Sequence, residues 1–315
     1  MSGPLVTIGI PTRNRVSLLE RAVGSALAQQ HVELEVVVSD NASTDATAAL
    51  CERLAASDDR VRVIRHESDI GPERNFRAVL AAARGSYFMW LADDDWLDPG
   101  YAAACVSALE LAPDHALACG RGRYYRDGAF AFVERRVDIQ ASSARVRLVG
   151  FYRTVGLNGP YYGVMRRQQL QRLPLVTGLA SDWLLVAAVA WSGKVRTLDG
   201  VAIHRRLEGA SEGHASLAGA YGLSRRHAWH VHLLIAAHVF RDVEASPVYG
   251  AVGRPERLLL GSVCAALVVV RFWPRAMAAR LLSRLGRLDA ARLRLERRRG
   301  EDARPPGGGN RPDST

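Results

Sequence analysis

Short apolar runs alternate with helix-like patterns through the first hundred residues. Apolar runs typical of buried strands cover residues 5–10, 34–39, 61–66 and 87–91. Between them, Ser17 and Glu20 have capping-box spacing at the start of one helical pattern, and Gly71-Pro72 starts another that Gly85 ends. The alternation predicts parallel strands joined by right-handed crossovers, and therefore an α/β fold with a doubly wound, mostly parallel sheet and flanking helices.

The pattern is less regular after Pro99. We expect a helix to about residue 111, then short strands and one apolar helix that starts at Ser181 and ends at Gly193. The expected strands cover residues 116–125, 129–133, 161–165, 195–198 and 201–204. We therefore predict a catalytic domain over residues 1–212, a helical C-terminal appendage over 213–300 and a disordered tail over 301–315.

Polar residues follow three of the predicted strands directly. They are Thr12, Arg13 and Asn14 after the first strand, Asp40 and Asn41 after the second, and Asp93, Asp94 and Asp95 after the fourth. Doubly wound sheets bind ligands outside the carboxyl ends of their strands. The three clusters are therefore predicted to form one site.

The acidic cluster at residues 93–95 predicts a metal ion. Three adjacent carboxylates repel one another and resist burial unless a cation neutralises them. In an extended chain Asp93 and Asp95 point the same way, and two carboxylates on one face suit Mg²⁺ or Mn²⁺. The alternative interpretation is a solvated acidic turn after a strand.

The first strand is not followed by a glycine-rich phosphate loop, neither G-x-G-x-x-G nor a P-loop. This weakens a dehydrogenase or kinase interpretation. The diphosphate of a bound nucleotide would need a metal ion instead, and the acidic cluster can supply one.

Composition and charge narrow the class of protein. Hydrophobic residues make up 48% of the 315 residues, as in globular proteins, and the formal net charge is +10. From Arg271 onward there are 12 arginines against 5 acidic residues, so the rest of the chain is nearly balanced. A nearly balanced body argues against nucleic-acid binding.

Localisation is predicted from apolar stretches and cysteines. No basic-then-apolar leader precedes the first strand, and the longest uncharged apolar stretch, 258–270, is shorter than the ~20 residues that a bilayer requires. Four widely spaced cysteines are typical of buried residues in a reducing compartment. We expect a cytoplasmic protein. The basic amphipathic pattern over 271–299 indicates either peripheral contact with the inner membrane face or a helix packed on the catalytic domain.

Five motifs together resemble the family 2 glycosyltransferases, which have the GT-A fold. The resemblance covers about two-thirds of the chain, residues 5–210, and rests on segments 6–15, 38–45, 71–75, 91–96 and 181–183. Residues 93–95 are similar to the D-x-D metal motif of the family. Ser181-Asp182-Trp183 stands where the family has an acidic pair before a helix, although the first acid is a serine here.

The resemblance implies roles for the donor-binding residues. A nucleotide-sugar donor would be held at its nucleoside by Pro11, Thr12, Asn14 and Asp40, with Asp40 facing the base. Asp93 would lie near the ribose and sugar, with Asp94 in the same donor-binding motif. Asp95 would ligate the metal that bridges the diphosphate. His204 or Arg205 is similar to a late basic element that contacts the diphosphate or the metal.

The resemblance also implies the reaction. Asp182 would be the general base that takes a proton from an acceptor hydroxyl, and single displacement would invert the anomeric centre. Its position at a helix start would keep it ionised through the helix dipole. Processive polysaccharide synthases of this family usually carry a Q-x-x-R-W pattern. This sequence lacks it, so we predict transfer of a single sugar. The acceptor could be a surface glycan, a natural product or a lipid-linked glycan, and the basic C-terminal region suits the last.

Other interpretations remain open at this point. Asp182 could cap its helix, Asp40 could form a turn, and His204 and Arg205 could belong to an ordinary strand edge. A nucleotidyltransferase would also use a metal ion on an α/β sheet. A non-catalytic nucleotide- or carbohydrate-binding protein would keep the fold and lack the base.

Overall fold

The protein was analysed as a computed structural model that describes residues 3–207, 230–274 and 277–278. The chain divides into two compact units, Met1–Val268 and Val269–Thr315, and the sheet lies in the first. The predicted domain boundary at residue 212, the predicted tail and most of the basic 271–299 pattern lie outside the described residues.

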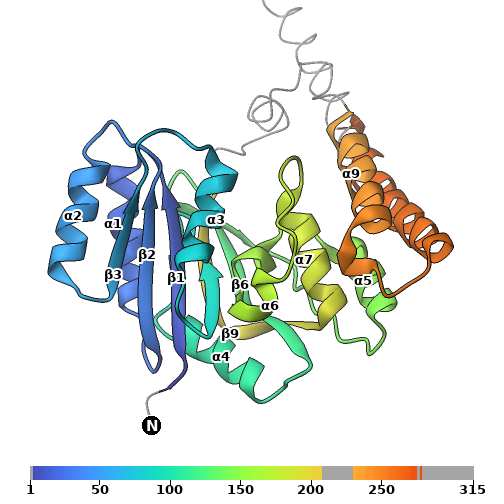
Figure 1. The fold of residues 1–315 in the computed structure, drawn as a ribbon, viewed down its shortest axis with the longest axis horizontal. Helices are drawn as coiled ribbons and strands as arrows, with labels where there is room; N and C mark the ends of the chain where they lie inside the picture. Colours follow the sequence, from blue (N-terminus) through green and yellow to red (C-terminus); the bar gives the residue numbers. More distant parts are fainter. Residues whose placement is uncertain (1–2, 208–229, 275–276, 279–315) are drawn as a thin grey trace, which may run out of the picture. The chain divides into compact units, whose positions relative to one another are not determined.

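A nine-stranded mixed sheet forms the centre of the first unit (Figure 1). Its order is β3-β2-β1-β4-β8-β6-β9-β5, with β7 paired to β6. The strands are β1 (Leu5–Thr12), β2 (Glu33–Asp40), β3 (Val61–Arg65), β4 (Tyr87–Trp90), β5 (Trp96–Leu97), β6 (His115–Arg126), β7 (Ala129–Val133), β8 (Val164–Arg166) and β9 (Lys194–Arg206). The first four in this order are parallel, as are β6 and β9. The predicted α/β class and the predicted crossovers of the first half are confirmed.

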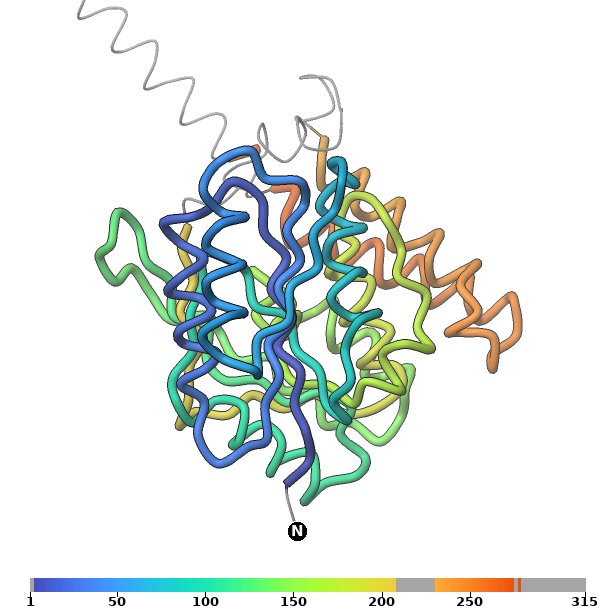
Figure 2. Tube along the Cα trace, turned by 60° about the vertical axis from the view of Figure 1, so that its left-hand side comes forward, coloured from blue at the N-terminus to red at the C-terminus, as the bar shows by residue number. Residues whose placement is uncertain are grey.

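Helices cover the sheet on both sides (Figures 1 and 2). They are α1 (Val16–Leu27), α2 (Thr47–Ser57), α3 (Pro72–Ala82), α4 (Tyr101–Glu110), α5 (Ala144–Thr154), α6 (Arg167–Gln171), α7 (Ser181–Ser192) and α9 (Val231–Ala245), with 3₁₀ turns η1 (Gly159–Tyr162) and η3 (Pro247–Tyr249).

Strand β1 is buried on both of its faces. Ile8 and Ile10 are fully buried in one hydrophobic cluster with Leu19 of α1. On the other face Gly9 lets α3 approach, because a Cβ at Gly9 would lie 2.8 Å from a Val79 methyl. Full burial of each large apolar side chain contributes about 1.5–3 kcal/mol. This packing fixes the direction in which the polar ends of β1, β2 and β4 project.

Three sequence-based expectations about elements differ from the structure. Helix α1 begins at Val16 without a side-chain cap, so Ser17 is not a capping-box residue. Ser43 and Thr47 hydroxyls instead accept bonds from the backbone N–H groups of Asn14 and Arg15, at 2.9 and 3.0 Å. The strand expected at 161–165 is confirmed only at its end, because η1 covers Tyr161 and Tyr162 and β8 begins at Val164. The two short strands expected at 195–204 are one strand, β9.

The last described helix, Arg254–Pro274, is longer than the apolar pattern indicated. It has 21 residues, and by length and composition it could cross a membrane. The helix extends beyond the uncharged stretch 258–270 because it continues through the charged residues on either side. Only 22% of its most apolar window is buried.

Candidate active site

The carboxyl ends of β1, β2 and β4 lie at one edge of the sheet, and the predicted polar residues meet there. Thr12, the last residue of β1, donates a hydrogen bond of 2.7 Å to Asp93 Oδ2. Burial raises the pKa of Asp93 to about 6, partly opposed by this hydrogen bond. The predicted convergence of the first and fourth strand ends is confirmed by this contact.

The acidic residues are not arranged as an extended strand would place them. The chain leaves β4 at Trp90, and residues 93–94 form a turn. Asp93 contacts Thr12, whereas Asp95 pairs with Arg205. The expectation that strand alternation aligns Asp93 and Asp95 is wrong, because the turn points their carboxylates at different partners. Asp94 contributes its backbone carbonyl, which accepts a bond of 2.9 Å from Arg21.

Asp95 is the most buried carboxylate of the acidic cluster, with 2% of its surface exposed. Its Oδ2 lies 3.1 Å from Arg205 Nε, and its Oδ1 accepts a bond of 3.2 Å from the backbone N–H of Arg206. Burial raises the pKa of Asp95 to about 7, although the charge of Arg205 opposes the shift. A buried carboxylate with a raised pKa gains from any further positive charge that reaches it.

Arg205 contacts several elements of the site at once. Its Nη1 donates to Tyr124 Oη at 2.7 Å and to the Leu157 carbonyl at 3.3 Å. Its guanidinium lies 4.4 Å from the centre of the Tyr162 ring, a cation–π contact. Strand β9 places Arg205 beside Tyr124 of β6, because the two residues are register partners.

Sequence reasoning missed Glu134 and Tyr124. Glu134 is 8% exposed and accepts bonds from Tyr124 Oη at 3.2 Å and from the Gly159 N–H at 3.1 Å. Burial raises the pKa of Glu134, opposed chiefly by the charge of Arg205. Glycines are the available sequence signal, because a Cβ at Gly159 or at Gly122 would collide with the Glu134 carboxylate.

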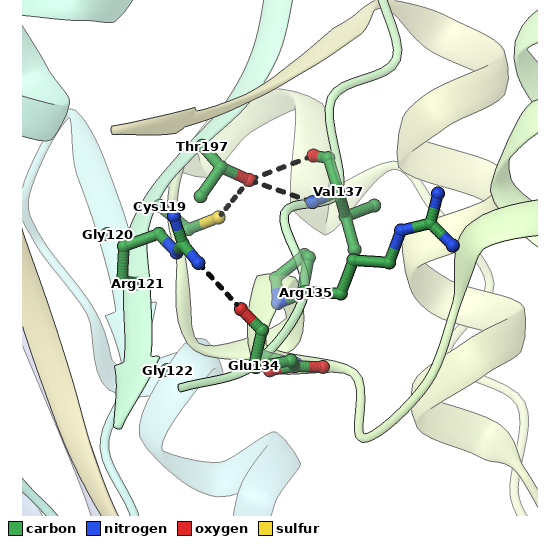
Figure 3. A pocket seen from close by; sticks show the side chains of 10 residues that line it. Cys119, Gly120, Arg121, Gly122, Glu134, Arg135, Val137 and Thr197 are labelled. Atoms are coloured by element: carbon green, nitrogen blue, oxygen red, sulfur yellow. Dashed lines mark hydrogen bonds between the residues drawn. The ribbon is translucent and has the colours of Figure 1, made fainter. Parts of the chain in front are cut away.

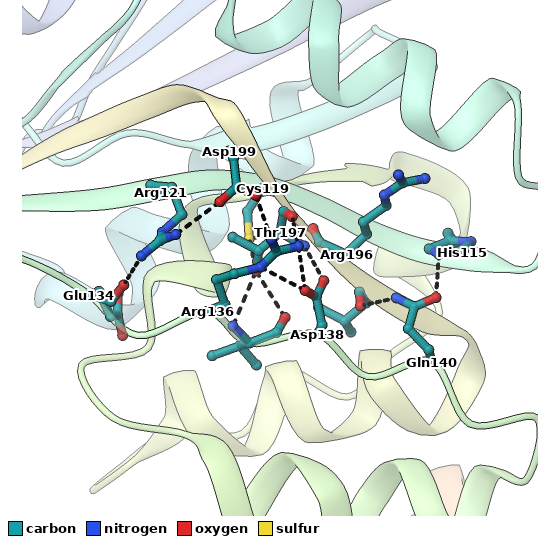
Figure 4. A network of polar contacts seen from close by, with 12 residues as sticks. His115, Cys119, Arg121, Glu134, Arg136, Asp138, Gln140, Arg196, Thr197 and Asp199 are labelled. Atoms are coloured by element: carbon teal, nitrogen blue, oxygen red, sulfur yellow. Dashed lines mark hydrogen bonds and ion pairs between the residues drawn. The ribbon is translucent and has the colours of Figure 1, made fainter.

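A polar network fixes the segment that carries Glu134 (Figures 3 and 4). Arg121 donates to the Glu134 carbonyl at 3.1 Å and pairs with Asp199 at 2.9 Å. Thr197 accepts from the Val137 N–H at 3.2 Å and donates to the Val137 carbonyl at 3.0 Å. The irregular chain after β7 is thus held against β6 and β9.

Asp182 lies in the first turn of α7, as predicted. Its Oδ2 accepts a hydrogen bond of 3.1 Å from Asn158 Nδ2. Burial raises the pKa of Asp182, and the bond from Asn158 and the charge of Arg205 only partly oppose the rise. The backbone N–H groups of Trp183 and Asp182 at the helix start lower the pKa, as the dipole argument expects, but burial outweighs them. A raised pKa makes the ionised carboxylate a stronger base.

Asp95 and Asp182 are joined through a short series of contacts. Arg205 pairs with Asp95 and donates to the carbonyl of Leu157. The next residue, Asn158, donates to Asp182. Asn158 holds a left-handed conformation with φ of 58°, which aims its amide at α7. The predicted metal ligand and the predicted base therefore lie on one connected group of residues.

The end of β2 carries buried acceptors. Asp40 is fully buried; its Oδ1 accepts from the Ser43 N–H at 3.1 Å, and within the described chain Oδ2 has no hydrogen-bond partner. Asn75 Oδ1, at the same end of the strands, likewise has none among the described residues. Buried acceptors normally have donors, so a ligand N–H fits here.

The remaining residues predicted to hold the nucleoside shape the loop after β1. Pro11 is buried within β1. Asn14 adopts a φ of 53°, and its Oδ1 accepts a bond of 2.8 Å from the Thr44 N–H. Asn14 therefore ties the loop after β1 to the loop after β2.

His204 is held away from Asp95. Its Nε2 lies 2.8 Å from Asp98 Oδ1 and its Nδ1 lies 2.8 Å from Tyr125 Oη. Its ring stacks on Trp96, with centroids 5.0 Å apart. Because both ring nitrogens have partners, the geometry favours Arg205 over His204 as the late basic residue of the site.

A divalent ion fits the site only together with a substrate. Across residues 3–207, 230–274 and 277–278 no group of three or more His, Cys, Asp or Glu side chains could hold an ion. Mg²⁺ is commonly held by one or two carboxylates plus substrate phosphates, and Asp95 is such a carboxylate. The donor set therefore fits an ion that arrives with a diphosphate.

Comparison with known proteins decides the family. A family model described as "Glycosyl transferase family 2" matches residues 7–173, more than half of the chain. The chain belongs to this family. The predicted family resemblance is confirmed.

Curated relatives match a part of this family 2 chain. It is 35% identical to a chondroitin synthase of Pasteurella multocida over 116 residues, which are 37% of this chain and 12% of the synthase. It is 36% identical over 98 residues to the Campylobacter jejuni "GalNAc(5)-diNAcBac-PP-undecaprenol beta-1,3-glucosyltransferase", covering 31% of this chain and 32% of that protein. The chain thus spans a third or less of the length of these relatives.

Solved structures show the same fold. Residues 1–349 of Staphylococcus aureus TarS with UDP-GlcNAc match with a TM-score of 0.58 and 16% identity, over 86% of this chain and 73% of that one. A mannosyltransferase of Pyrobaculum calidifontis with GDP-Man and Mn²⁺ matches with a TM-score of 0.51 and 19% identity, over 91% and 80%. This family 2 chain therefore has the GT-A fold that the sequence predicted.

Proposed function

We propose that this family 2 enzyme transfers one sugar from a nucleoside diphosphate sugar to an acceptor hydroxyl, with inversion and with Asp182 as general base. The observation that carries the proposal is the connection from Asp182 through Asn158 and Leu157 to Arg205 and Asp95. This connection supports the proposal, because it links Asp182, the proposed base, to Asp95, the proposed cation ligand, within one cluster.

The donor half of the site is assigned to the ends of β1, β2 and β4. Asp40 Oδ2 accepts an N–H from the nucleobase, because it is buried without a partner among the described residues. Pro11, Thr12 and Asn14 shape the loop around the nucleoside, and Asp93 and Asp94 lie beside its ribose and sugar. UDP-GlcNAc and GDP-Man in the two similar structures support a nucleoside diphosphate donor.

The diphosphate is assigned to Asp95 and Arg205. Bound Mg²⁺ or Mn²⁺ supplies positive charge to the leaving diphosphate. The Mn²⁺ of the similar mannosyltransferase supports a divalent ion here. Arg205 lies 3.1 Å from Asp95 and provides a second, permanent positive charge for the same oxygens.

The acceptor half is assigned to the start of α7. The acceptor hydroxyl gives its proton to Asp182 as it attacks the anomeric carbon, while the bond to the diphosphate breaks. Asn158 orients the carboxylate through its bond of 3.1 Å. The diphosphate-linked undecaprenol in the name of the Campylobacter relative supports a lipid-linked acceptor.

Thermal unfolding with nucleoside diphosphates tests the donor site. We expect one base to raise the melting temperature, and the rise to need Mn²⁺ or Mg²⁺. Asp95→Asn should abolish the dependence on the ion, whereas Asp114→Asn, a control at an exposed ion pair with Lys194, should keep it. Absence of stabilisation by every base, with and without the ion, would overturn the donor assignment.

A further inference from the structure

The helix Arg254–Pro274 exposes an apolar face in its long uncharged stretch. No charged residue occurs between Arg257 and Arg271. Leu259 is 65% exposed and Val270 is 71% exposed, and Leu258 and Val263 are partly exposed on the same stretch. Large exposed apolar side chains grouped on one element mark an interaction surface more often than isolated ones do.

The other face of this helix is packed within the first unit. Leu260, Cys264 and Val268 are buried. Gly261 lies against α9, because a Cβ there would lie 3.1 Å from the Phe240 carbonyl oxygen. Arg145 of α5 forms an ion pair with Glu256 at the start of the helix. The helix is therefore packed firmly on one face, so the exposure of its other face is a feature of the folded unit.

We propose that this exposed face docks in the plane of an anionic phospholipid membrane. Arginines stand at both ends of the apolar stretch, at Arg254, Arg257 and Arg271. The 12 arginines and 5 acidic residues from Arg271 onward follow directly in sequence, whereas the preceding chain is nearly balanced. Apolar side chains enter the interface while arginines contact lipid phosphates.

The packing favours docking in the plane over spanning. A spanning helix exposes its whole circumference to lipid, but Cys264 and Val268 are fully buried in the protein. Insertion across the bilayer would separate Gly261 from Phe240 and Arg145 from Glu256. The uncharged stretch, at ~1.5 Å per residue, is also about 20 Å long and shorter than the ~30 Å hydrocarbon core.

The charges also favour a membrane over a second copy of the chain. In a two-fold dimer the same face meets itself. Whether the paired helices ran parallel or antiparallel, an arginine-flanked end of the apolar stretch would meet an arginine-flanked end of the other copy. Like charges at such positions disfavour the pairing.

Vesicle co-sedimentation of the full chain tests the proposal. Wild type should sediment with phosphatidylcholine–phosphatidylglycerol vesicles and much less with phosphatidylcholine alone. Leu259→Glu should lower binding to the anionic vesicles by about tenfold or more, because a charge would enter the interface. Leu111→Glu is the matched control, since Leu111 is 86% exposed at the end of α4, and it should bind as wild type does.

A second measurement reports insertion without a charge change. Trp273 is 37% exposed near the end of the same helix. Brominated lipids should quench wild-type fluorescence more than that of Trp273→Phe. Thermal unfolding should give the same midpoint for Leu259→Glu and Leu111→Glu, because both sites are exposed.

Two results would overturn the proposal. One is equal vesicle binding by wild type and Leu259→Glu. The other is a wild-type protein that does not bind vesicles and forms a dimer in analytical ultracentrifugation, where the Leu259→Glu variant is a monomer. Neither measurement contains donor or acceptor, so the outcome is independent of the proposed glycosyl transfer.

Discussion

Buried carboxylates lie at both ends of the parallel strands, but their pKa values are shifted in opposite directions at the two ends. At the amino end, Glu35 accepts bonds from the Thr7 hydroxyl and the Arg84 N–H, both at 2.5 Å, and from Arg62 at 2.9 Å. These partners lower its pKa despite the opposing effect of burial. At the carboxyl end, burial raises the pKa of Asp93 to about 6 and that of Asp95 to about 7.

The number of donors explains the difference. Glu35 has enough hydrogen-bond donors to stabilise its charge, so it contributes to stability. At the other end, Asp40 Oδ2 has no donor among the described residues, and Asp95 depends on Arg205. Groups left short of partners are available to a ligand. The number of hydrogen-bond donors around a buried carboxylate therefore distinguishes a stabilising residue from one that is available to a ligand.

The largest expected effect comes from Asp182→Asn. We expect kcat to fall by about 10²–10⁴-fold, because the acceptor proton loses its base. Donor affinity and the unfolding midpoint should change little, because Asn keeps the shape of the side chain. Initial rates and donor binding by calorimetry measure the two effects. A protein with unchanged donor binding and no turnover in either form would be a binding protein instead.

The pH profile sharpens the same assignment. A base must be ionised, so kcat should fall about tenfold per pH unit below the pKa of Asp182. Burial raises this pKa, so the acidic limb should lie above the ~3.9 of an ordinary Asp. The measurement is kcat against pH at saturating donor and acceptor. A limb at or below the ordinary value would argue against Asp182.

Glu35→Gln tests whether the carboxylate at the amino end of the strands contributes to stability. We expect a loss of about 1–2 kcal/mol in the free energy of unfolding at pH 7, since bonds to a charged acceptor are weakened. The lowered pKa means that this stability is present above the unfolded pKa of ~4.3 and is lost as pH falls through the folded pKa. The difference between wild type and variant in urea unfolding should therefore narrow at pH 3.

Turnover is the control for this variant. Glu35 lies at the opposite end of β2 from Asp40, so kcat at pH 7 should match wild type. A large loss of kcat with an unchanged free energy of unfolding would contradict a purely stabilising role at the amino end of the strands.

The smallest effect on stability is expected at an exposed ion pair near the carboxyl ends of β1 and β2. Arg13 pairs with Asp69, and both side chains are nearly half exposed. Arg13→Ala should change the free energy of unfolding by less than about 1 kcal/mol. Urea unfolding measures this change. A larger loss would mean that position on this edge, rather than burial, decides the contribution of a charge.

Local patterns were enough to predict the first half of the fold. Strand β4 and the β6–β7 hairpin follow from apolar runs and turn residues, and Pro72 marks the start of α3. The contact between Thr12 and Asp93 follows from parallel strands that end at one edge. These features depend on short sequence distances or on a general property of α/β sheets.

The rest depends on contacts that no local pattern specifies. Asp95 and Arg205 are 110 residues apart, and their pairing requires the turn at 93–94 and the alignment of β9 with β6. Glu134 lies in irregular chain that only tertiary contacts hold. The Asn158 conformation that orients Asp182 is a single left-handed residue. The assignment of Glu134 and Tyr124 to the site therefore needed coordinates.

Arg205 has a consequence for how the site responds to mutation. One guanidinium is shared between Asp95, Tyr124 and the carbonyl beside Asn158. A change at Asp95 alters the position and charge balance of this group, which is connected to Asp182 through Leu157 and Asn158. The free-energy costs of Asp95→Asn and Asp182→Asn should thus be non-additive, and a thermodynamic cycle on binding and turnover would give the coupling between donor and acceptor halves.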